Sequence, residues 1–134
     1  MLLQPAARRF CMLAALLLAL ATLIGALAAH AFKHRLPPDQ YALLQTALQY
    51  HSVHALGLMA IGLLCERSPQ RALQVAGWLM FCGIVLFSGS LYALVGGAPR
   101  ALGVLTPIGG LALIIGWCTV AISMGGRAAA DDNP

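Results

Sequence analysis

Residues 72–95 read ALQVAGWLMFCGIVLFSGSLYALV, a run of 24 residues that contains no Asp, Glu, Lys or Arg. A helix needs about 20 residues to cross the hydrocarbon core of a bilayer, so this run is long enough to span it. Arg71 precedes the run, and Gly96-Gly97 follow it. Because backbone polar groups must be satisfied internally in lipid, the run is predicted to be a transmembrane helix.

Three further runs have the same character, at residues 10–29, 46–65 and 102–124. All charged residues of the 134-residue chain lie outside the four runs, and they make up only 9% of it. Soluble domains carry about 25% charged residues, and a small globule has too much surface to cover with so few charges. The sequence therefore predicts an all-α fold, a four-helix transmembrane bundle with antiparallel neighbours, as a single domain over residues 1–134.

The connections between the runs set the helix boundaries. Ser68-Pro69 and the Gly96–Ala101 stretch with Pro99 predict tight turns between antiparallel helices. In the first, longer connection, Pro37-Pro38 suits the start of a helix. The stretch before the second run is predicted to be either an interfacial helix or a polar extension of the second helix. The small, polar C-terminal residues 125–134 are predicted to be disordered.

The basic residues predict the orientation. With four spans both termini share one side of the membrane, and the side richer in Lys and Arg faces the cytoplasm. The terminal side carries five basic residues and the other side three: Arg8, Arg9, Arg67, Arg71 and Arg127 against Lys33, Arg35 and Arg100. Cytoplasmic termini are therefore expected. These scattered charges form no stripe that could follow a phosphate backbone, so we expect the lipid bilayer as a partner and no nucleic acid.

The first run also resembles a signal peptide, because Arg8 and Arg9 precede it and Ala26-Leu27-Ala28 lie near its end. Its apolar part is longer than the usual 7–15 residues of a signal peptide. We therefore expect a first helix that is retained in the mature protein.

Uncharged polar residues gather in the predicted outer half of the bilayer. Thr46, Tyr50 and His54 recur every four residues, so they share one face of a helix. A polar face within the hydrocarbon must look into the bundle. The predicted polar cluster comprises His30, Tyr50, His54, Ser88, Ser90, Tyr92 and Thr106. Two interpretations remain open: hydrogen bonds that fix the helix register, or an outward-facing pocket for a proton, an ion or a small solute.

Neither a metal centre nor an enzyme is expected. His30/His34 and His51/His54 are spaced to offer two nitrogens to one ion, but zinc normally takes three or four protein ligands. The chain contains no Ser-His-acid set and no paired carboxylates, and Glu66 stands alone on the opposite side of the membrane. We therefore predict no metal, no cofactor and no enzymatic activity.

Small residues and one proline indicate where helices approach or bend. Small residues at every fourth position let helix backbones come close in lipid, and a proline within a helix kinks it. The predicted packing or kink positions are Gly25, Gly89, Pro107, Gly109 and Gly110. The small-residue face of the first helix fits a contact within the bundle and a homo-oligomer equally well. A membrane protein partner is a further open alternative.

Four strings connect the chain to a known family: GALAAH at 25–30, QTALQYHSVHAL at 45–56, LFSGSLY at 86–92 and TPIGG at 106–110. In this order and spacing they resemble the YgdD-like family of small bacterial inner-membrane proteins, domain of unknown function 423, to which eukaryotic transmembrane protein 256 is similar. The resemblance covers residues 24–123. The family's first string usually reads GAFGAH, and Leu27 and Ala28 depart from it, which puts close packing there in doubt.

The resemblance implies four spans in a bacterial inner membrane and no established activity. We therefore expect a structural or accessory membrane protein, with an outward-facing binding or transporter-like site as the alternative.

Overall fold

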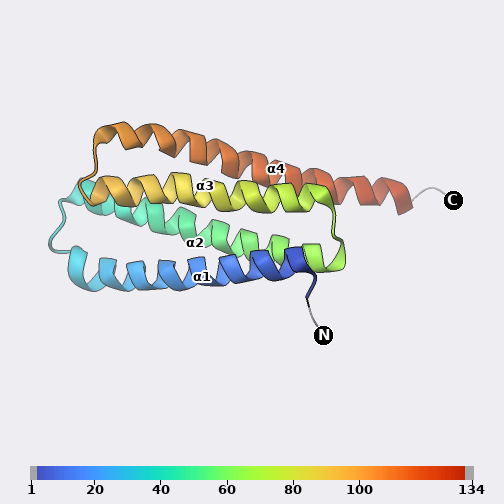
Figure 1. The fold of residues 1–134 in the computed structure, drawn as a ribbon. Coiled ribbons are helices and arrows are strands. Elements are labelled where there is room, and N and C mark those ends of the chain that lie inside the picture. The colour runs from blue at the N-terminus through green and yellow to red at the C-terminus, as the bar shows by residue number, and fades with distance from the viewer. Residues whose placement is uncertain (1–2, 132–134) are drawn as a thin grey trace.

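The computed structural model describes the backbone of residues 3–131 and the side chains of residues 3–125. Four long helices run antiparallel in chain order (Figure 1): α1 Pro5–Leu27, α2 Pro38–Arg67, α3 Arg71–Val95 and α4 Leu105–Asp131. A π-helix, η1 Ala28–Phe32, continues α1, and a 3-10 helix, η2 Arg100–Val104, leads into α4. All four are long and apolar enough to cross a membrane. The predicted all-α four-helix bundle is confirmed, and the described residues contain no strand.

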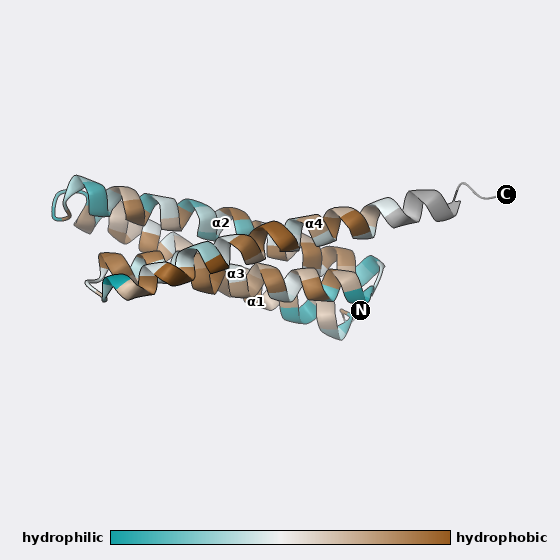
Figure 2. Cartoon of the chain, turned by 90° about the horizontal axis from the view of Figure 1, so that it is seen from above, coloured by the Kyte–Doolittle hydropathy of each residue, from teal (hydrophilic) through white to brown (hydrophobic). Residues whose placement is uncertain are grey.

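The two ends of the bundle differ. Both chain termini lie at one end, beside the turn from α2 to α3, and we call this the terminal end (Figure 1). There the backbone N–H of Gln4 donates to the Glu66 carboxylate at 2.7 Å, which ties the start of α1 to the end of α2. The opposite end, with η1 and η2, is the loop end. Hydrophilic residues concentrate at the two ends and hydrophobic residues between them (Figure 2), as expected for a bundle in a bilayer.

The proline positions explain where α2 and α4 begin. Pro38 opens α2, where the missing N–H has no intrahelical partner to lose. From there α2 is one unbroken helix of 30 residues, so the segment before the second span is a polar extension and not a separate interfacial helix. Pro107 lies in the first turn of α4, where it likewise breaks no hydrogen bond.

The segment predicted to be disordered, residues 125–134, is helical through Asp131 in the structure. Ala128–Ala130 favour this continuation, because alanine has the highest intrinsic helix propensity. Residues 132–134 lie outside the described part of the chain.

The helices pack mainly as α1 on α2, α2 on α3 and α3 on α4, whereas α1 and α3 meet only narrowly. Their contact is at the terminal end, where the Phe10 ring fills the space over Gly77. A Cβ atom on Gly77 would lie 2.6 Å from that ring. Toward the loop end, residues of α1, α2 and α3 line cavities instead of a closed core. The side chains of the closed core include Phe10, Leu58, Ile61, Cys65, Met80 and Ile84.

The contact between α3 and α4 is close because glycines line it. A Cβ atom on Gly83 would lie 2.5 Å from the Leu113 side chain, and one on Gly109 would overlap the backbone of Phe87. Gly109 is thus at a helix contact, as predicted, and Gly110 only touches the Phe87 ring at an ordinary distance. Around Gly25 and Gly89, a Cβ atom would meet no described atom within 4 Å. These two predicted packing positions lie in open space, since no neighbouring helix approaches their side of α1 and α3.

Candidate functional site

The residues of the predicted polar cluster do not meet at one point but divide among four places in the bundle. His30 lies on η1, exposed, and forms no hydrogen bond to the other cluster residues within the described part of the chain. The remaining residues form three groups: Ser90 with Thr106, Tyr50 with His54, and Ser88 with Tyr92. Helix geometry separates them, because α2 and α3 each turn by about 100° per residue and so distribute nearby positions over different faces.

Ser90 and Thr106 join α3 to α4. The Ser90 hydroxyl donates to the Phe87 carbonyl at 2.9 Å, and its oxygen lies 2.7 Å from the Thr106 hydroxyl. Because the single Ser90 proton is engaged with Phe87, Thr106 must be the donor in the second bond. Both hydroxyls are satisfied, so this group fixes the register of two helices.

Tyr50 and His54 form an aromatic group on the side of α2 toward α4. The Tyr50 ring stacks on Phe87 with centroids 4.4 Å apart, and His54 lies 6.2 Å from Trp117. His54 Nδ1 donates to the Tyr50 carbonyl at 2.7 Å, so the lone pair of its neutral ring is on Nε2. Gln49, Tyr50, Val53 and His54 line an open pocket of about 330 Å³.

The third group lies between α1, α2 and α3 and includes a residue absent from the predicted cluster. His51 is 2% exposed, and its Nδ1 lies 3.1 Å from the Tyr92 hydroxyl. Ser88 is 1% exposed. His51, Ser88 and Tyr92 all line one cavity of about 170 Å³. His51 Nε2 and Ser88 Oγ are both buried and have no hydrogen-bond partner in the described structure. We call His51, Ser88 and Tyr92 the polar centre.

Unpaired buried polar atoms are rare in native structures, and each one calls for a cause such as local strain, a functional role, or a bound water or ion. Leaving a polar group buried without a partner costs about 1–3 kcal/mol. The cavity beside them far exceeds the roughly 10–15 Å³ that one water needs. The polar centre is therefore the candidate site of the bundle, because two of its residues carry buried polar atoms without a partner beside a cavity.

The polar four-residue spacing Thr46–Tyr50–His54 does not include His51, so this pattern leaves His51 out of the predicted cluster. The signal for His51 lies in the apolar residues. Leu44, Leu48, Ala55 and Leu58 are buried at positions that form one stripe along α2, and His51 stands in the middle of this stripe. An ionisable residue in the centre of an apolar stripe marks a buried polar site.

Among the described residues, no group of three or more His, Cys, Asp or Glu side chains comes together that could hold a metal ion. The four cysteines, Cys11, Cys65, Cys82 and Cys118, carry free thiols. The chemistry available at the polar centre is hydrogen bonding by an imidazole and two hydroxyls.

Comparisons with known proteins place the chain in a family. The family model described as Protein of unknown function (DUF423) matches residues 24–110, a range that includes all four strings singled out above. The UPF0382 membrane protein YwdK of Bacillus subtilis is 42% identical over 115 residues, which cover 85% of this chain and 94% of the relative. A UPF0382 membrane protein of Haemophilus influenzae is 39% identical over 99 residues, which cover 73% and 78%.

No solved structure gives a significant match to the chain. The membrane protein relatives agree with the four apolar helices found here. The chain is a small integral protein of the cell membrane, and it belongs to the DUF423 family of proteins of unknown function.

Proposed function

We propose that this protein is a non-enzymatic binding protein that holds a small uncharged molecule at its polar centre. The observation that carries the proposal is the pair of buried, unpaired atoms, His51 Nε2 and Ser88 Oγ, on two residues that line one cavity. In the hydrocarbon region no bulk water replaces a missing partner, so a bound molecule with hydrogen-bonding groups would recover the cost.

A binding role is favoured over a purely structural one by the contrast with Ser90. A polar group that serves only to fix helices is paired within the protein, as Ser90 is with Thr106 and Phe87. Ser88 is more deeply buried than Ser90 but lacks such a partner. The polar centre also lacks a carboxylate next to the imidazole, so the proposal includes no general acid–base catalysis.

The proposal places the protein in the bacterial inner membrane with both termini in the cytoplasm. The excess of basic residues at the terminal end supports this orientation. The polar centre then lies toward the outer leaflet, because His51, Ser88 and Tyr92 are nearer the loop end of their helices. Modification of single cysteines by a membrane-impermeant thiol reagent, at the Ser68-Pro69 turn and at Arg35, tests the orientation. Labelling of intact cells at the turn and not at Arg35 would contradict it.

Ser88→Ala tests the binding role, because the two alternatives predict opposite changes in stability. Without a bound molecule, removal of an unpaired buried hydroxyl leaves stability unchanged or raises it. With one, the variant loses ligand-linked stabilisation, and Tm falls by roughly 4 °C for each 1 kcal/mol lost. We expect a lower Tm than wild type in nanodiscs of native lipid extract, and no decrease after exhaustive delipidation in detergent.

Ser123→Ala is the matched control, because the Ser123 hydroxyl bonds only to the Val120 carbonyl of its own helix. It is expected to behave alike in both preparations. If Ser88→Ala is as stable as wild type in native lipid as well, the polar centre holds nothing and the binding role is wrong.

A further inference from the structure

Two adjacent arginines near the start of α1 lie on the side of the helix that faces away from the bundle. α1 buries Ala7 and Phe10 against the other helices, whereas Arg8 and Arg9 are exposed. Both arginines belong to an open pocket of about 260 Å³ at the terminal end, and its lining residues are Pro5, Arg8, Arg9 and Met12. In a membrane this pocket faces the surrounding lipid, at the level where the charged residues of the terminal end mark the edge of the hydrocarbon.

The positive charge of this pocket is not balanced by a described carboxylate, because none lines it. Glu66 is the acidic residue whose side chain is described at the terminal end, and its carboxylate accepts the backbone N–H of Gln4 at 2.7 Å. Asp39 lies at the loop end, in the first turn of α2. A guanidinium is always charged, and its planar set of donors matches the oxygens of a phosphate or a carboxylate. The pocket is therefore complementary to an anion.

A row of exposed apolar side chains continues from the pocket along the same side of α1. Its members recur at spacings of three or four residues, which keeps them on one side of a helix, and they are 45–66% exposed: Met12, Leu16, Leu20, Leu23 and Leu27. We call these residues the apolar strip. The helix rises about 12 Å from Met12 to Leu20, close to the ~15 Å of hydrocarbon in one leaflet. An acyl chain that lies on the strip thus places its head group beside the arginines.

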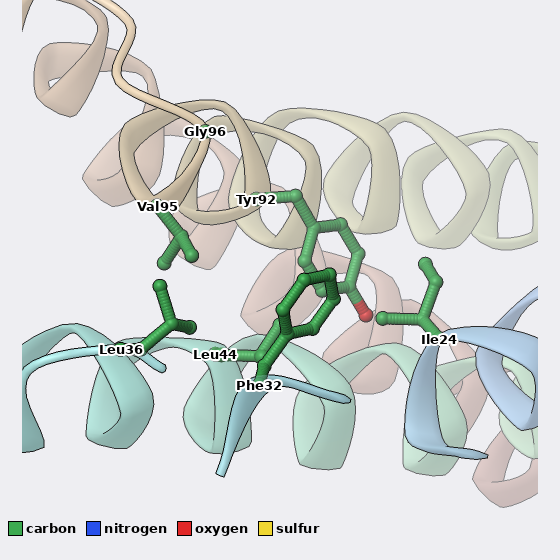
Figure 3. Close-up of a pocket in the computed structure, with 7 residues that line it drawn as sticks. All are labelled: Ile24, Phe32, Leu36, Leu44, Tyr92, Val95 and Gly96. Atoms are coloured by element: carbon green, nitrogen blue, oxygen red, sulfur yellow. The ribbon is translucent and has the colours of Figure 1, made fainter. Parts of the chain in front are cut away.

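The apolar cavity at the loop end has no such polar part (Figure 3). Its lining residues include Ile24, Phe32 and Val95, and none of its lining residues is charged. Hydrocarbon of any lipid would fill this cavity equally well. Of these two hollows, only the pocket at Arg8 and Arg9 can distinguish one lipid from another by its charge.

The charge of the pocket selects among phospholipids. A phosphodiester accepts hydrogen bonds from both guanidinium groups. In phosphatidylcholine a cationic group follows the phosphate, and two arginines would repel it. The lining offers neither a carboxylate nor an aromatic ring to hold that cation. A water-soluble anion would bind the arginines but would make no use of the apolar strip.

We infer that the pocket at Arg8 and Arg9 binds the phosphate head group of an anionic phospholipid, whose acyl chain lies along the apolar strip of α1. Basic residues next to a membrane span hold anionic head groups by the same electrostatic attraction. The inference goes beyond the proposed function, because the pocket shares no residue with the polar centre.

The experiment measures which lipids surround the apolar strip in a bilayer. Leu16→Trp, in a full-length chain that also carries Trp78→Phe and Trp117→Phe, places a single tryptophan about 10 Å below Arg9 along the helix. Vesicles of phosphatidylcholine contain a minor fraction of lipid with brominated acyl chains, which quench a nearby tryptophan. We expect brominated phosphatidylglycerol to be enriched at this tryptophan at least ~5-fold over brominated phosphatidylcholine, as even one arginine beside an anionic head group provides.

Matched variants separate a site from the general attraction of a basic surface. Arg8→Gln and Arg9→Gln are each expected to lower the enrichment at least ~2-fold. Arg67→Gln removes one positive charge from the same end, but Arg67 does not line the pocket, so the enrichment should not change. A single tryptophan at Ile114 instead is the second control, because this residue of α4 is 61% exposed and α4 has no described charged side chain. No enrichment is expected there.

Native mass spectrometry of the delipidated chain with its natural tryptophans gives an independent result if the tryptophan variants fail to fold. More bound phosphatidylglycerol than phosphatidylcholine is expected, and a smaller excess for Arg9→Gln.

Equal quenching by the two brominated lipids at Leu16→Trp would overturn the inference. So would equal losses for Arg9→Gln and Arg67→Gln, which would indicate a diffuse surface charge. Sodium phosphate and sodium chloride are compared at equal ionic strength, because screening alone weakens binding in both. A loss of enrichment in phosphate alone would show that free phosphate is the ligand and that the lipid assignment is wrong. None of these outcomes bears on the stability of Ser88→Ala, so the proposed function is tested separately.

Discussion

α3 packs closely against α4 on one flank and only narrowly against α1 on the other. Toward α4, glycines bring the backbones together, and Ser90 is fully paired with Thr106 and Phe87. Toward α1, the helices touch at Phe10 and then leave a groove, where Ser88 is buried without a partner. Ser88 and Ser90 stand two residues apart, about 200° around the helix. A single short string, FSGSLY, thus supplies one serine that is paired between helices and one that is buried without a partner.

The contrast between the two sides of α3 follows from what drives helices together in a bilayer. Helices in a bilayer gain no hydrophobic free energy by association, so they come together where small residues and hydrogen bonds favour contact. The flank toward α4 has both features. The flank toward α1 has a large side chain at one end and a cavity at the other, so α1 is held mainly by α2.

The largest expected effect comes from opening the closed end of the α1–α3 flank. Phe10→Ala removes a fully buried ring that fills the space over Gly77, and it should lower the free energy of unfolding by about 3–5 kcal/mol. Leu16→Ala on the same helix is the control, since Leu16 is 66% exposed, and it should cost far less. Equal losses in a denaturant titration in micelles would mean that the Phe10 contact does not hold α1 against α3.

A smaller effect is expected from forcing the tight flank apart. Gly109→Ala places a methyl group against the Phe87 backbone, which cannot move aside as a flexible side chain can. We expect a loss of about 1–3 kcal/mol, typical of overpacking. Gly110→Ala, one residue away, meets only the Phe87 ring at 3.5 Å and should be neutral or stabilising, because alanine favours helix. The same micelle titration measures both, and equal effects would contradict the close approach of α3 and α4.

The smallest effect tests the hydrogen bond on the tight flank. Thr106→Val removes the donor to Ser90 and should cost about 0.6 kcal/mol, the average for such bonds between transmembrane helices. Thr119→Val is the control, because the Thr119 hydroxyl bonds only to the Ile115 carbonyl of its own helix. A double-mutant cycle with Ser90→Ala isolates the bond. A coupling energy of zero would show that Ser90 and Thr106 act independently.

Much of the fold was predictable from single residues. Charge-free runs of 20 residues or more revealed the four spans, because a charge in hydrocarbon is costly wherever a helix packs. Pro38 marked the start of α2 for an equally local reason, since proline fits the first turn of a helix. The polar stretch after Pro38 continues into the span as one helix, and there Leu44 packs with Ala28 of η1, a contact that no local pattern reveals.

The candidate site was predictable only in part. Ser88 and Tyr92 were identified, because polar residues inside a span stand out from their surroundings. His30, Tyr50, His54, Ser90 and Thr106 stood out for the same reason, yet the structure places them apart from Ser88 and Tyr92. Spacing shows which residues share a face of one helix, but it contains no information about which neighbouring helix that face meets.

The sequence by itself determined that this chain spans a membrane four times and keeps charge out of the hydrocarbon, because both properties follow from residues taken one helix at a time. Only the tertiary structure decided that His51 rather than His54 joins Tyr92, and that Ser88 is buried unpaired while Ser90 is not. The physical reason is that hydrogen bonds act over about 3 Å, so pairing depends on how each helix is rotated against its neighbours.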